Sequence, residues 1–161
     1  KSTGEVLGVG KKFEDAVYKG LVAAGYKMER TGGVLLTVRD RDKDEIVDIG
    51  RRFHEMGFKI FATVGTALVL NENNVPAKVV KRMAEKAPNI GDLLESGQVT
   101  YVISTSTKGR QPEQDEVKMR RKAVESSISL LTSLDTARAL LNCLESNKTM
   151  ADIDLVDINT I

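Results

Sequence analysis

The sequence is poor in the residues that carry disulfide, redox and zinc chemistry. It holds one cysteine, Cys143, and one histidine, His54. A single cysteine excludes an intrachain disulfide, and one cysteine with one histidine is too few for a Cys/His zinc site. Cys143 falls among leucines in a predicted helix, so we interpret it as a small buried hydrophobic residue. We therefore expect no metal in this chain.

An excess of charge of one sign and long apolar runs are also missing. Lys and Arg number 24 against 23 Asp and Glu, so the chain lacks the broad basic face that non-specific nucleic-acid binding requires. No apolar run approaches the ~20 residues that cross a bilayer, and the N-terminus has no apolar signal-peptide core. We expect a cytoplasmic protein that binds neither nucleic acid nor membrane.

The composition that remains is that of an ordinary folded domain. Of the 161 residues, 41% are hydrophobic and 29% are charged. This length supports one substantial core but is short for two domains of usual size. No internal repeat, low-complexity segment or long linker interrupts the chain, so one domain over residues 1–161 is expected.

Helical and strand periods alternate along the chain. Apolar residues at helical spacing predict helices over 13–24 and 46–56, and short runs rich in β-forming residues predict strands over 34–38 and 58–63. The later elements follow the same rule: strands at 77–80, 99–104 and 129–131, helices from 66 and over 90–95, 115–127 and 134–145, and a further edge strand at 153–158. The predicted class is α/β, with a mainly parallel sheet covered by helices on both faces.

Polar turns follow several of these strands, where ligands of open α/β sheets bind. The turn at residues 63–66 carries two threonines around Gly65, which suits a phosphate at a helix N-terminus. The turn at 104–107 has four consecutive hydroxyls. Lys43, Arg82 and Lys81 could add positive charge to the same crevice. Taken singly, each turn also fits an ordinary helix cap, and each lysine a solvated surface residue.

Three other patterns fit structural roles better. Residues 132–135 fit a broad capping box at a helix start. The basic run at 118–122 is typical of a solvated helix face, with docking to a neighbouring domain as the sharper alternative. His54 belongs to a helix far from the hydroxyl turns, so a catalytic role is not expected.

Several segments together resemble the C-terminal regulatory domain of the large subunit of carbamoyl-phosphate synthetase. Residues 1–8 (KSTGEVLG) resemble the segment that leaves the second ATP-grasp half of that enzyme, and residues 1–9 would be the entering linker. The segments 61–67 (FATVGTA), 101–106 (YVISTS) and 131–137 (LTSLDTA) then follow in the order of the family's methylglyoxal-synthase-like (MGS-like) domain. The resemblance covers the whole chain and implies a domain excised from a longer protein.

The resemblance implies a fold and a regulatory task. The fold would be a three-layer sandwich around a five-stranded parallel sheet. The domain itself would be no enzyme; it would bind UMP, phosphoribosyl pyrophosphate or IMP, in that order of expectation. Through its parent ligase it would regulate ATP-dependent, glutamine-hydrolysing synthesis of carbamoyl phosphate for the pyrimidine and arginine pathways. The domain would need no cofactor, whereas the parent would use ATP with Mg or Mn and K. Partners would be the synthetase domains and the glutaminase small subunit, in an oligomeric enzyme.

Carried over by motif, the effector's phosphate would be held by seven residues: Lys43, Thr63, Thr66, Arg82, Ser104, Thr105 and Ser106. Thr132 resembles a residue that contacts ornithine and is a possible second effector contact. Some positions depart from the enteric-type pattern: Val64 replaces a histidine, Ser104 an asparagine and Ser106 a threonine. Arg82 stands where a lysine is familiar, with Lys81 as a competing alignment. Hydroxyls and a cation remain, so phosphate binding should survive.

Two other functions stay open at this point. A methylglyoxal synthase-type lyase acting on dihydroxyacetone phosphate shares the fold, but it needs a carboxylate base and a histidine near the substrate. In this sequence the turn after the 99–104 strand carries hydroxyls in place of an aspartate, and Asp115 comes well after it. The third possibility is a structural oligomerisation module, in which the hydroxyl turns would act only as caps.

Overall fold

A computed structural model describes residues 5–105, 110–147, 149–157 and 159. The chain divides into two compact units. The larger, Arg30–Ala137, is called the sheet unit; the smaller, made of Lys1–Glu29 and Arg138–Ile161, is called the terminal unit. Each is described by itself. The expectation of one domain over residues 1–161 stays a prediction.

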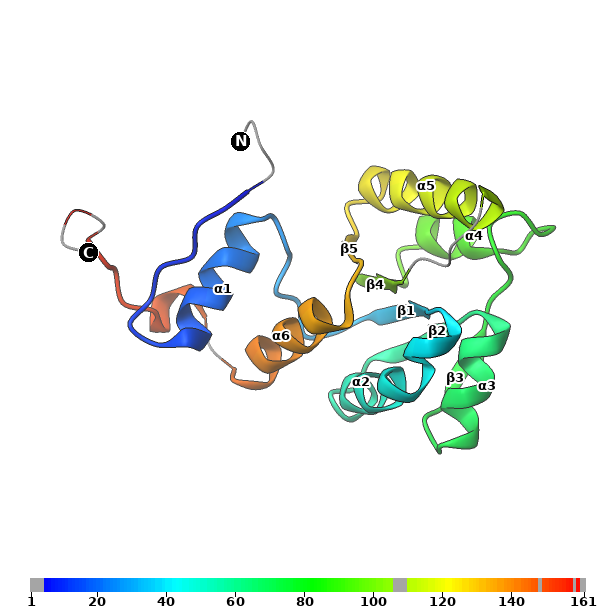
Figure 1. Cartoon of the computed structure of the whole chain (residues 1–161), viewed down its shortest axis with the longest axis horizontal. Helices are drawn as coiled ribbons and strands as arrows, with labels where there is room; N and C mark the ends of the chain where they lie inside the picture. The colour runs from blue at the N-terminus through cyan, green and yellow to red at the C-terminus, as the bar shows by residue number, and fades with distance from the viewer. Residues whose placement is uncertain (1–4, 106–109, 148, 158, 160–161) are drawn as a thin grey trace. The chain divides into compact units, whose positions relative to one another are not determined.

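The sheet unit is built on a five-stranded sheet whose strands are all parallel (Figure 1). The strands are β1 (Gly33–Thr37), β2 (Lys59–Ala62), β3 (Ala77–Val79), β4 (Tyr101–Ser104) and β5 (Ser129–Leu131). Their order across the sheet is β3-β2-β1-β4-β5. The α/β class and the parallel sheet predicted from the sequence are confirmed. β1 lies at the centre because its apolar residues are buried on both faces.

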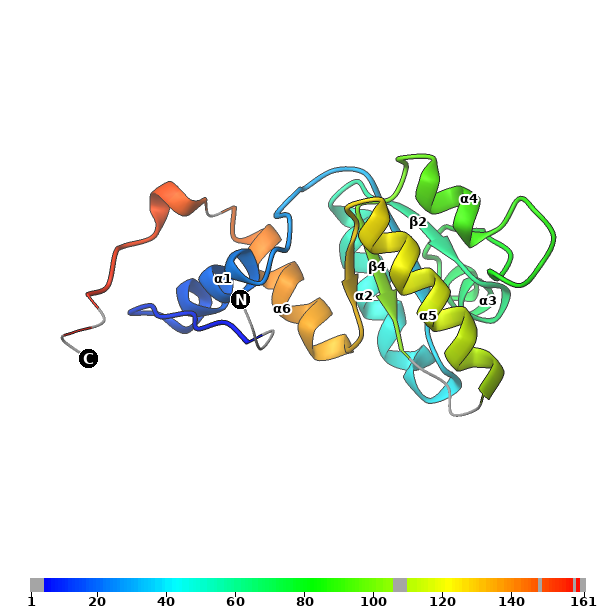
Figure 2. The ribbon, with the colours of Figure 1, turned by 90° about the horizontal axis from the view of Figure 1, so that it is seen from above.

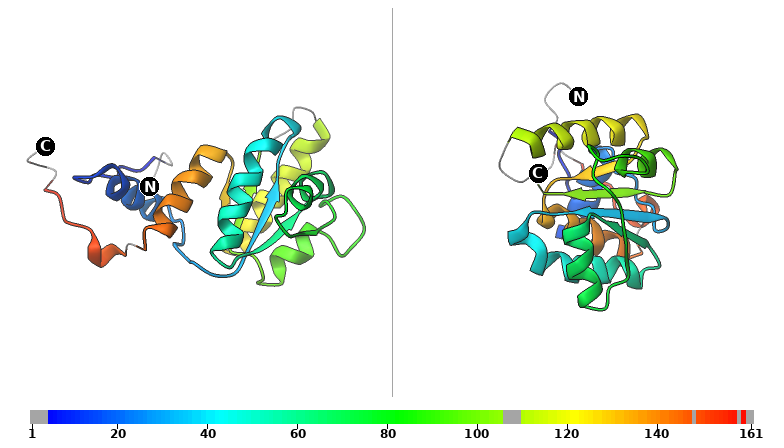
Figure 3. Two further views of the ribbon diagram at one scale, coloured as in Figure 1. Left: turned by 90° about the horizontal axis from the view of Figure 1, so that it is seen from below. Right: turned by 90° about the vertical axis from the view of Figure 1, so that its right-hand side faces the viewer.

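Helices cover both faces of this sheet, which makes three layers. The helices α2 (Lys43–Glu55) and α3 (Val64–Glu72) lie on one face, and α4 (Ile90–Glu95) and α5 (Arg110–Glu125) on the other (Figures 2 and 3). A short 3-10 helix, η1 (Asp40–Asp42), joins β1 to α2. After β5 the chain enters α6 (Leu134–Glu145), which begins in the sheet unit and continues into the terminal unit.

Successive residues of the central strands point into two separate cores, as the strand period requires. On one face, Leu35 and Val102 pack in a cluster with Met119 and Ala123 of α5. The opposite face holds an aromatic group. Phe53 of α2 meets Phe58 edge-on, with ring centroids 5.2 Å apart, and both rings lie near Tyr101.

Most predicted elements exist, but several boundaries differ and one element is absent. The helix expected over 115–127 begins earlier, at Arg110, and the strand expected over 99–104 begins at Tyr101. The helix expected from Thr66 begins at Val64, because Thr63 already has the extended backbone of an N-cap. The capping box expected at 132–135 is shifted by one residue: Ser133 is the cap, and its Oγ accepts the backbone N–H of Thr136 at 3.2 Å. The edge strand expected at 153–158 is wrong, since its described residues, 153–157, form no strand. The edges of the sheet are β3 and β5.

The terminal unit consists of α1 (Phe13–Ala23), part of α6, the 3-10 helix η2 (Met150–Asp152) and extended segments. Lys19 of α1 ties these segments together, since its ammonium donates to the backbone oxygens of Val9 at 2.8 Å and Asp154 at 2.7 Å. The chain also approaches α1 closely at Gly8, where a Cβ would lie 2.1 Å from the oxygen of Ala16. Across the described residues, no helix is long and apolar enough to span a membrane.

The aromatic group makes a testable prediction about stability. Phe53 is fully buried, whereas the adjacent His54 is exposed. Phe53→Ala should lower the free energy of unfolding by about 3–5 kcal/mol, because it leaves a cavity between α2 and the sheet. His54→Ala is the control and should change it by less than about 0.5 kcal/mol. Urea unfolding measures both, and two equal losses would contradict the packing described above.

Candidate functional site

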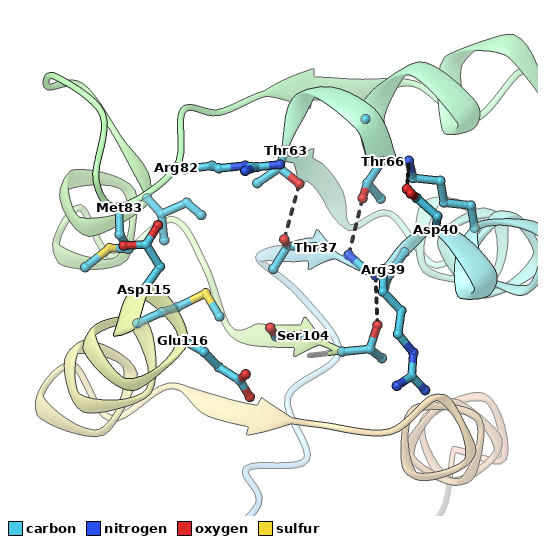
Figure 4. A pocket seen from close by; sticks show the side chains of 16 residues that line it. Thr37, Arg39, Asp40, Thr63, Thr66, Arg82, Met83, Ser104, Asp115 and Glu116 are labelled. Carbon is cyan, nitrogen blue, oxygen red and sulfur yellow. Dashed lines mark hydrogen bonds and ion pairs between the residues drawn. The ribbon is translucent and has the colours of Figure 1, made fainter. Parts of the chain in front are cut away.

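A cavity of about 330 Å³ lies at the carboxyl edge of the sheet. Its floor is formed where β1, β2 and β4 end, with Thr63 and Ser104 on either side of Thr37 (Figure 4). Thr105, the residue after Ser104, also lines it. β2 lies on one side of β1 and β4 on the other, and the chain leaves β1 towards α2 but leaves β4 towards α5. Connections that diverge to opposite faces open a crevice in parallel sheets, which explains the position of the cavity.

The N-terminus of α3 opens onto this cavity without a side-chain cap. Thr63 is the N-cap residue, but its hydroxyl donates to the Thr37 hydroxyl at 3.2 Å rather than capping the helix. The first backbone N–H groups of a helix have no partner within the helix and carry partial positive charge. Gly65 and Thr66, in this first turn, both line the cavity. The arrangement is suited to binding an anion.

Lys43 adds a full positive charge beside this helix end. A Cβ on Gly65 would lie 3.0 Å from the Lys43 Nζ atom, so glycine at position 65 lets the ammonium lie against the first turn of α3. The ammonium also donates to the Asp40 Oδ1 atom at 2.6 Å. This hydrogen bond and the charge of Lys43 lower the pKa of the Asp40 carboxyl. Asp40 is therefore ionised throughout the neutral pH range.

A buried carboxylate connects the turns after β1 and β4. Asp42 accepts a hydrogen bond from the Arg39 guanidinium at 2.6 Å and another from the Thr105 hydroxyl. The same hydroxyl accepts the Arg39 backbone N–H at 3.1 Å. Burial raises the pKa of Asp42, but the hydrogen bonds from Thr105 and Arg39, with the charges of Arg39 and Arg41, lower it further than burial raises it.

Besides Thr63, two more of the predicted phosphate ligands form hydrogen bonds within the fold. Thr105 uses its hydroxyl proton on Asp42 and its backbone N–H on the oxygen of Thr37 at 3.1 Å, which leaves it no donor for a ligand. The Thr66 hydroxyl accepts the backbone N–H of Val38 at 3.3 Å, which leaves its proton available to the cavity. Replacing Thr66 by valine would thus remove a ligand donor and leave a buried N–H unsatisfied.

Arg82 reaches the cavity from the loop after β3. Its side chain extends towards Thr63 in Figure 4 and forms no ion pair with any described residue. The loop is held by Asn89, whose amide donates to the Glu85 oxygen at 2.9 Å, and by the Arg82 backbone N–H, which donates to the Glu85 carboxylate at 2.7 Å. Lys81 does not line the cavity, so Arg82 is the residue of this pair that the structure brings to it.

The remaining walls were not predicted from the sequence. Met83, Ile90 and Met119 form an apolar wall that continues into the core, and Asp115 and Glu116 of α5 bring two carboxylates. Glu116 pairs with Arg120 at 2.7 Å. One feature of the sequence could have indicated Asp115 and Glu116: they lie in the first turns of the helix that follows β4, the strand that ends at the cavity.

The structure thus brings together six of the predicted phosphate ligands: Lys43, Thr63, Thr66, Arg82, Ser104 and Thr105. Ser104 is buried, and its hydroxyl forms no hydrogen bond with any described residue. Ser106 lies outside the described residues. Thr132 is exposed and does not line the cavity, although it follows β5 at the same edge of the sheet. Ligand contacts for all of these residues stay predictions.

Comparison with known proteins agrees with this fold. The family model described as "MGS-like domain" matches residues 45–132, which is more than half of the chain. The chain therefore belongs to the MGS-like domain family. Among solved structures, methylglyoxal synthase from Elizabethkingia anophelis NUHP1 is similar with a TM-score of 0.54 and 18% sequence identity, over 70% of this chain and 78% of that one. At this identity the likeness shows the fold alone.

The depressed pKa of Asp42 predicts how stability depends on pH. A carboxyl whose pKa is lower in the folded state stabilises the fold above its unfolded pKa of about 3.9, and this contribution is lost as the pH falls through the folded value. Asp42→Asn should therefore lower the free energy of unfolding by about 1–3 kcal/mol near pH 7, because it removes a charged acceptor. The difference from wild type should shrink below about pH 4.

Urea unfolding at several pH values measures this difference. Asp48→Asn removes the same charge from an exposed position on α2 and serves as the control. A gap between Asp42→Asn and wild type that stays constant down to about pH 2 would contradict the role given to this carboxylate.

Proposed function

We propose that this domain binds a phosphorylated small molecule in the cavity at the carboxyl edge of the sheet. The observation that carries the proposal is the convergence of two cations, Lys43 and Arg82, on the uncapped N-terminus of α3. Backbone N–H groups, an ammonium and a guanidinium are the donors that bind phosphate oxygens in proteins.

The rest of the cavity supports a ligand larger than free phosphate. Its volume of about 330 Å³ is at the lower end of the range for small-molecule sites. The wall of Met83, Ile90 and Met119 offers apolar contact to a flat base, since methionine adapts to irregular shapes. The carboxylates of Asp115 and Glu116 accept hydrogen bonds from sugar hydroxyls. A nucleoside monophosphate such as UMP suits this combination, ahead of phosphoribosyl pyrophosphate and IMP.

The proposed task of the site is regulation. The resemblance of four segments to the large subunit of carbamoyl-phosphate synthetase supports an allosteric domain that adjusts ATP-dependent carbamoyl-phosphate synthesis elsewhere in a parent enzyme. That parent would use ATP with Mg or Mn and K, and would work with a glutaminase subunit. Coupling of this kind amounts to about 1–3 kcal/mol between two sites, so a bound effector changes the affinity at the other site about fivefold to 150-fold.

A lyase of the methylglyoxal synthase type is the second candidate. Two observations favour it: a solved structure with a similar fold is a methylglyoxal synthase, and Asp115 and Glu116 line the cavity. Proton abstraction next to a carbonyl needs a carboxylate base, which either residue could be. The chemistry also needs a group that stabilises the enediolate, and His54 lines a different groove, with Lys59 and Lys78. This difference counts against the lyase, and we keep regulation as the proposed function.

An activity assay separates the two functions. We expect the pure chain to form no methylglyoxal from dihydroxyacetone phosphate, and that compound to compete with UMP only weakly. Turnover that disappears in Asp115→Asn or Glu116→Gln would establish the lyase instead. Turnover that persists in both variants would point to a contaminating enzyme.

Arg82→Gln tests the phosphate site directly. Loss of a charged donor from an exposed position should weaken UMP binding by about threefold to tenfold. Isothermal titration calorimetry measures the affinity. The matched control is Lys81→Gln, which removes the same charge one residue away from a side chain outside the cavity, and should change the affinity less than twofold.

Equal losses in Arg82→Gln and Lys81→Gln would indicate a diffuse electrostatic effect rather than a contact. No binding of UMP, phosphoribosyl pyrophosphate or IMP by the wild-type chain at millimolar concentration would reject the proposed function.

A further inference from the structure

The turn over residues 39–43 alternates positive and negative side chains. Its two carboxylates, which pair with cations of the same turn, differ in their exposure to solvent. Arg39 pairs with Asp42 at 2.6 Å, and Lys43 pairs with Asp40, also at 2.6 Å. The Asp42 side chain is only 11% exposed and is also bound by Thr105. The Asp40 side chain is 94% exposed. The first pair is thus part of the fold, whereas the carboxylate of the second pair lies in solvent.

The Lys43 ammonium lies at the position where an anion bound to α3 would meet it. It lines the cavity, lies against Gly65 in the first turn of α3, and is itself only 25% exposed. Among the described residues its ion-pair partner is Asp40. Asp40 also lines the cavity (Figure 4). Its carboxylate is therefore paired with the Lys43 ammonium, the cation that a bound anion would need.

We propose that Asp40 is a competing counter-ion that sets the affinity of the site: a phosphate enters by taking Lys43 from it. The inference rests on the proposed function and adds the residue that tunes it. Exposed ion pairs contribute little and are easily exchanged, so a bound phosphate on the helix N-terminus can displace Asp40. Arg39 stays with Asp42, because breaking that pair would take the nearest cation away from a buried carboxylate.

Removing Asp40 has two effects, and both favour the ligand. Lys43 no longer gives up an ion pair when it turns to the phosphate, and a negative charge that repels the phosphate at the cavity is gone. The opposite reading is that Asp40 is a positioning residue that holds the Lys43 side chain ready. In that case its removal would weaken binding, so the sign of the change distinguishes the two.

The test is calorimetric titration of the full chain with UMP, and with inorganic phosphate as a second probe. Asp40→Asn should bind UMP about twofold to tenfold more tightly than wild type at low salt, and the gain should shrink as salt screens exposed charges. Asp48→Asn, which removes an equal charge from an exposed position on α2, should stay within about twofold of wild type. In a Lys43→Gln background, Asp40→Asn should lose most of its effect.

The outcomes separate this inference from the function on which it rests. UMP binding by wild type, with tighter binding by Asp40→Asn that depends on Lys43, supports both. If wild type binds UMP and Asp40→Asn binds it equally or more weakly, Asp40 is not a competing counter-ion, but the proposed phosphate site stands. An equal gain in Asp48→Asn also overturns it, because the effect would then be net charge alone. No binding in any variant overturns both proposals.

Discussion

The hydrogen bonds of the Asp42 carboxylate are the interactions on which the geometry of the site depends. It joins two segments that are far apart in the sequence, since it binds the Arg39 guanidinium after β1 and the Thr105 hydroxyl after β4. Parallel strands bring their carboxyl ends to one edge but do not fix the turns that follow. A buried carboxylate needs hydrogen-bond donors from its surroundings, and Arg39 and Thr105 supply them. These hydrogen bonds hold the turns after β1 and β4 together at the floor of the cavity.

Within that frame, the site separates side chains that hold the fold from side chains that face the cavity. Thr105 uses its donors in hydrogen bonds within the protein, and the Thr63 hydroxyl donates to Thr37. What remains for a ligand is the first turn of α3, the Ser104 hydroxyl, and the two cations Lys43 and Arg82. Such a division fits phosphate recognition, in which backbone N–H groups and long cationic side chains provide most of the contacts.

The alternation of helical and strand periods predicted the sheet and its helices well, because both signals are local. The residues at the ends of β2 and β4 were predictable for the same reason: each follows an apolar run directly. Asp115 and Glu116 were not, since they reach the cavity only through the path of α5 over the sheet. The roles of Thr105 and Asp42 depend on a contact across 63 positions of sequence, which no local pattern indicates. The strand expected at 153–158 failed because an apolar run alone does not provide a partner strand.

The most direct test of the central claim is an NMR titration of the labelled chain with UMP, followed through its backbone amides. A phosphate on the N-terminus of α3 must hydrogen-bond to the first-turn N–H groups, which shifts their proton resonances. The account predicts saturable shifts that are largest at Val64, Gly65 and Thr66, with smaller ones at Ser104. Shifts that cluster instead around His54, Lys59 and Lys78, or amides of α3 that remain unchanged at saturation, would contradict it.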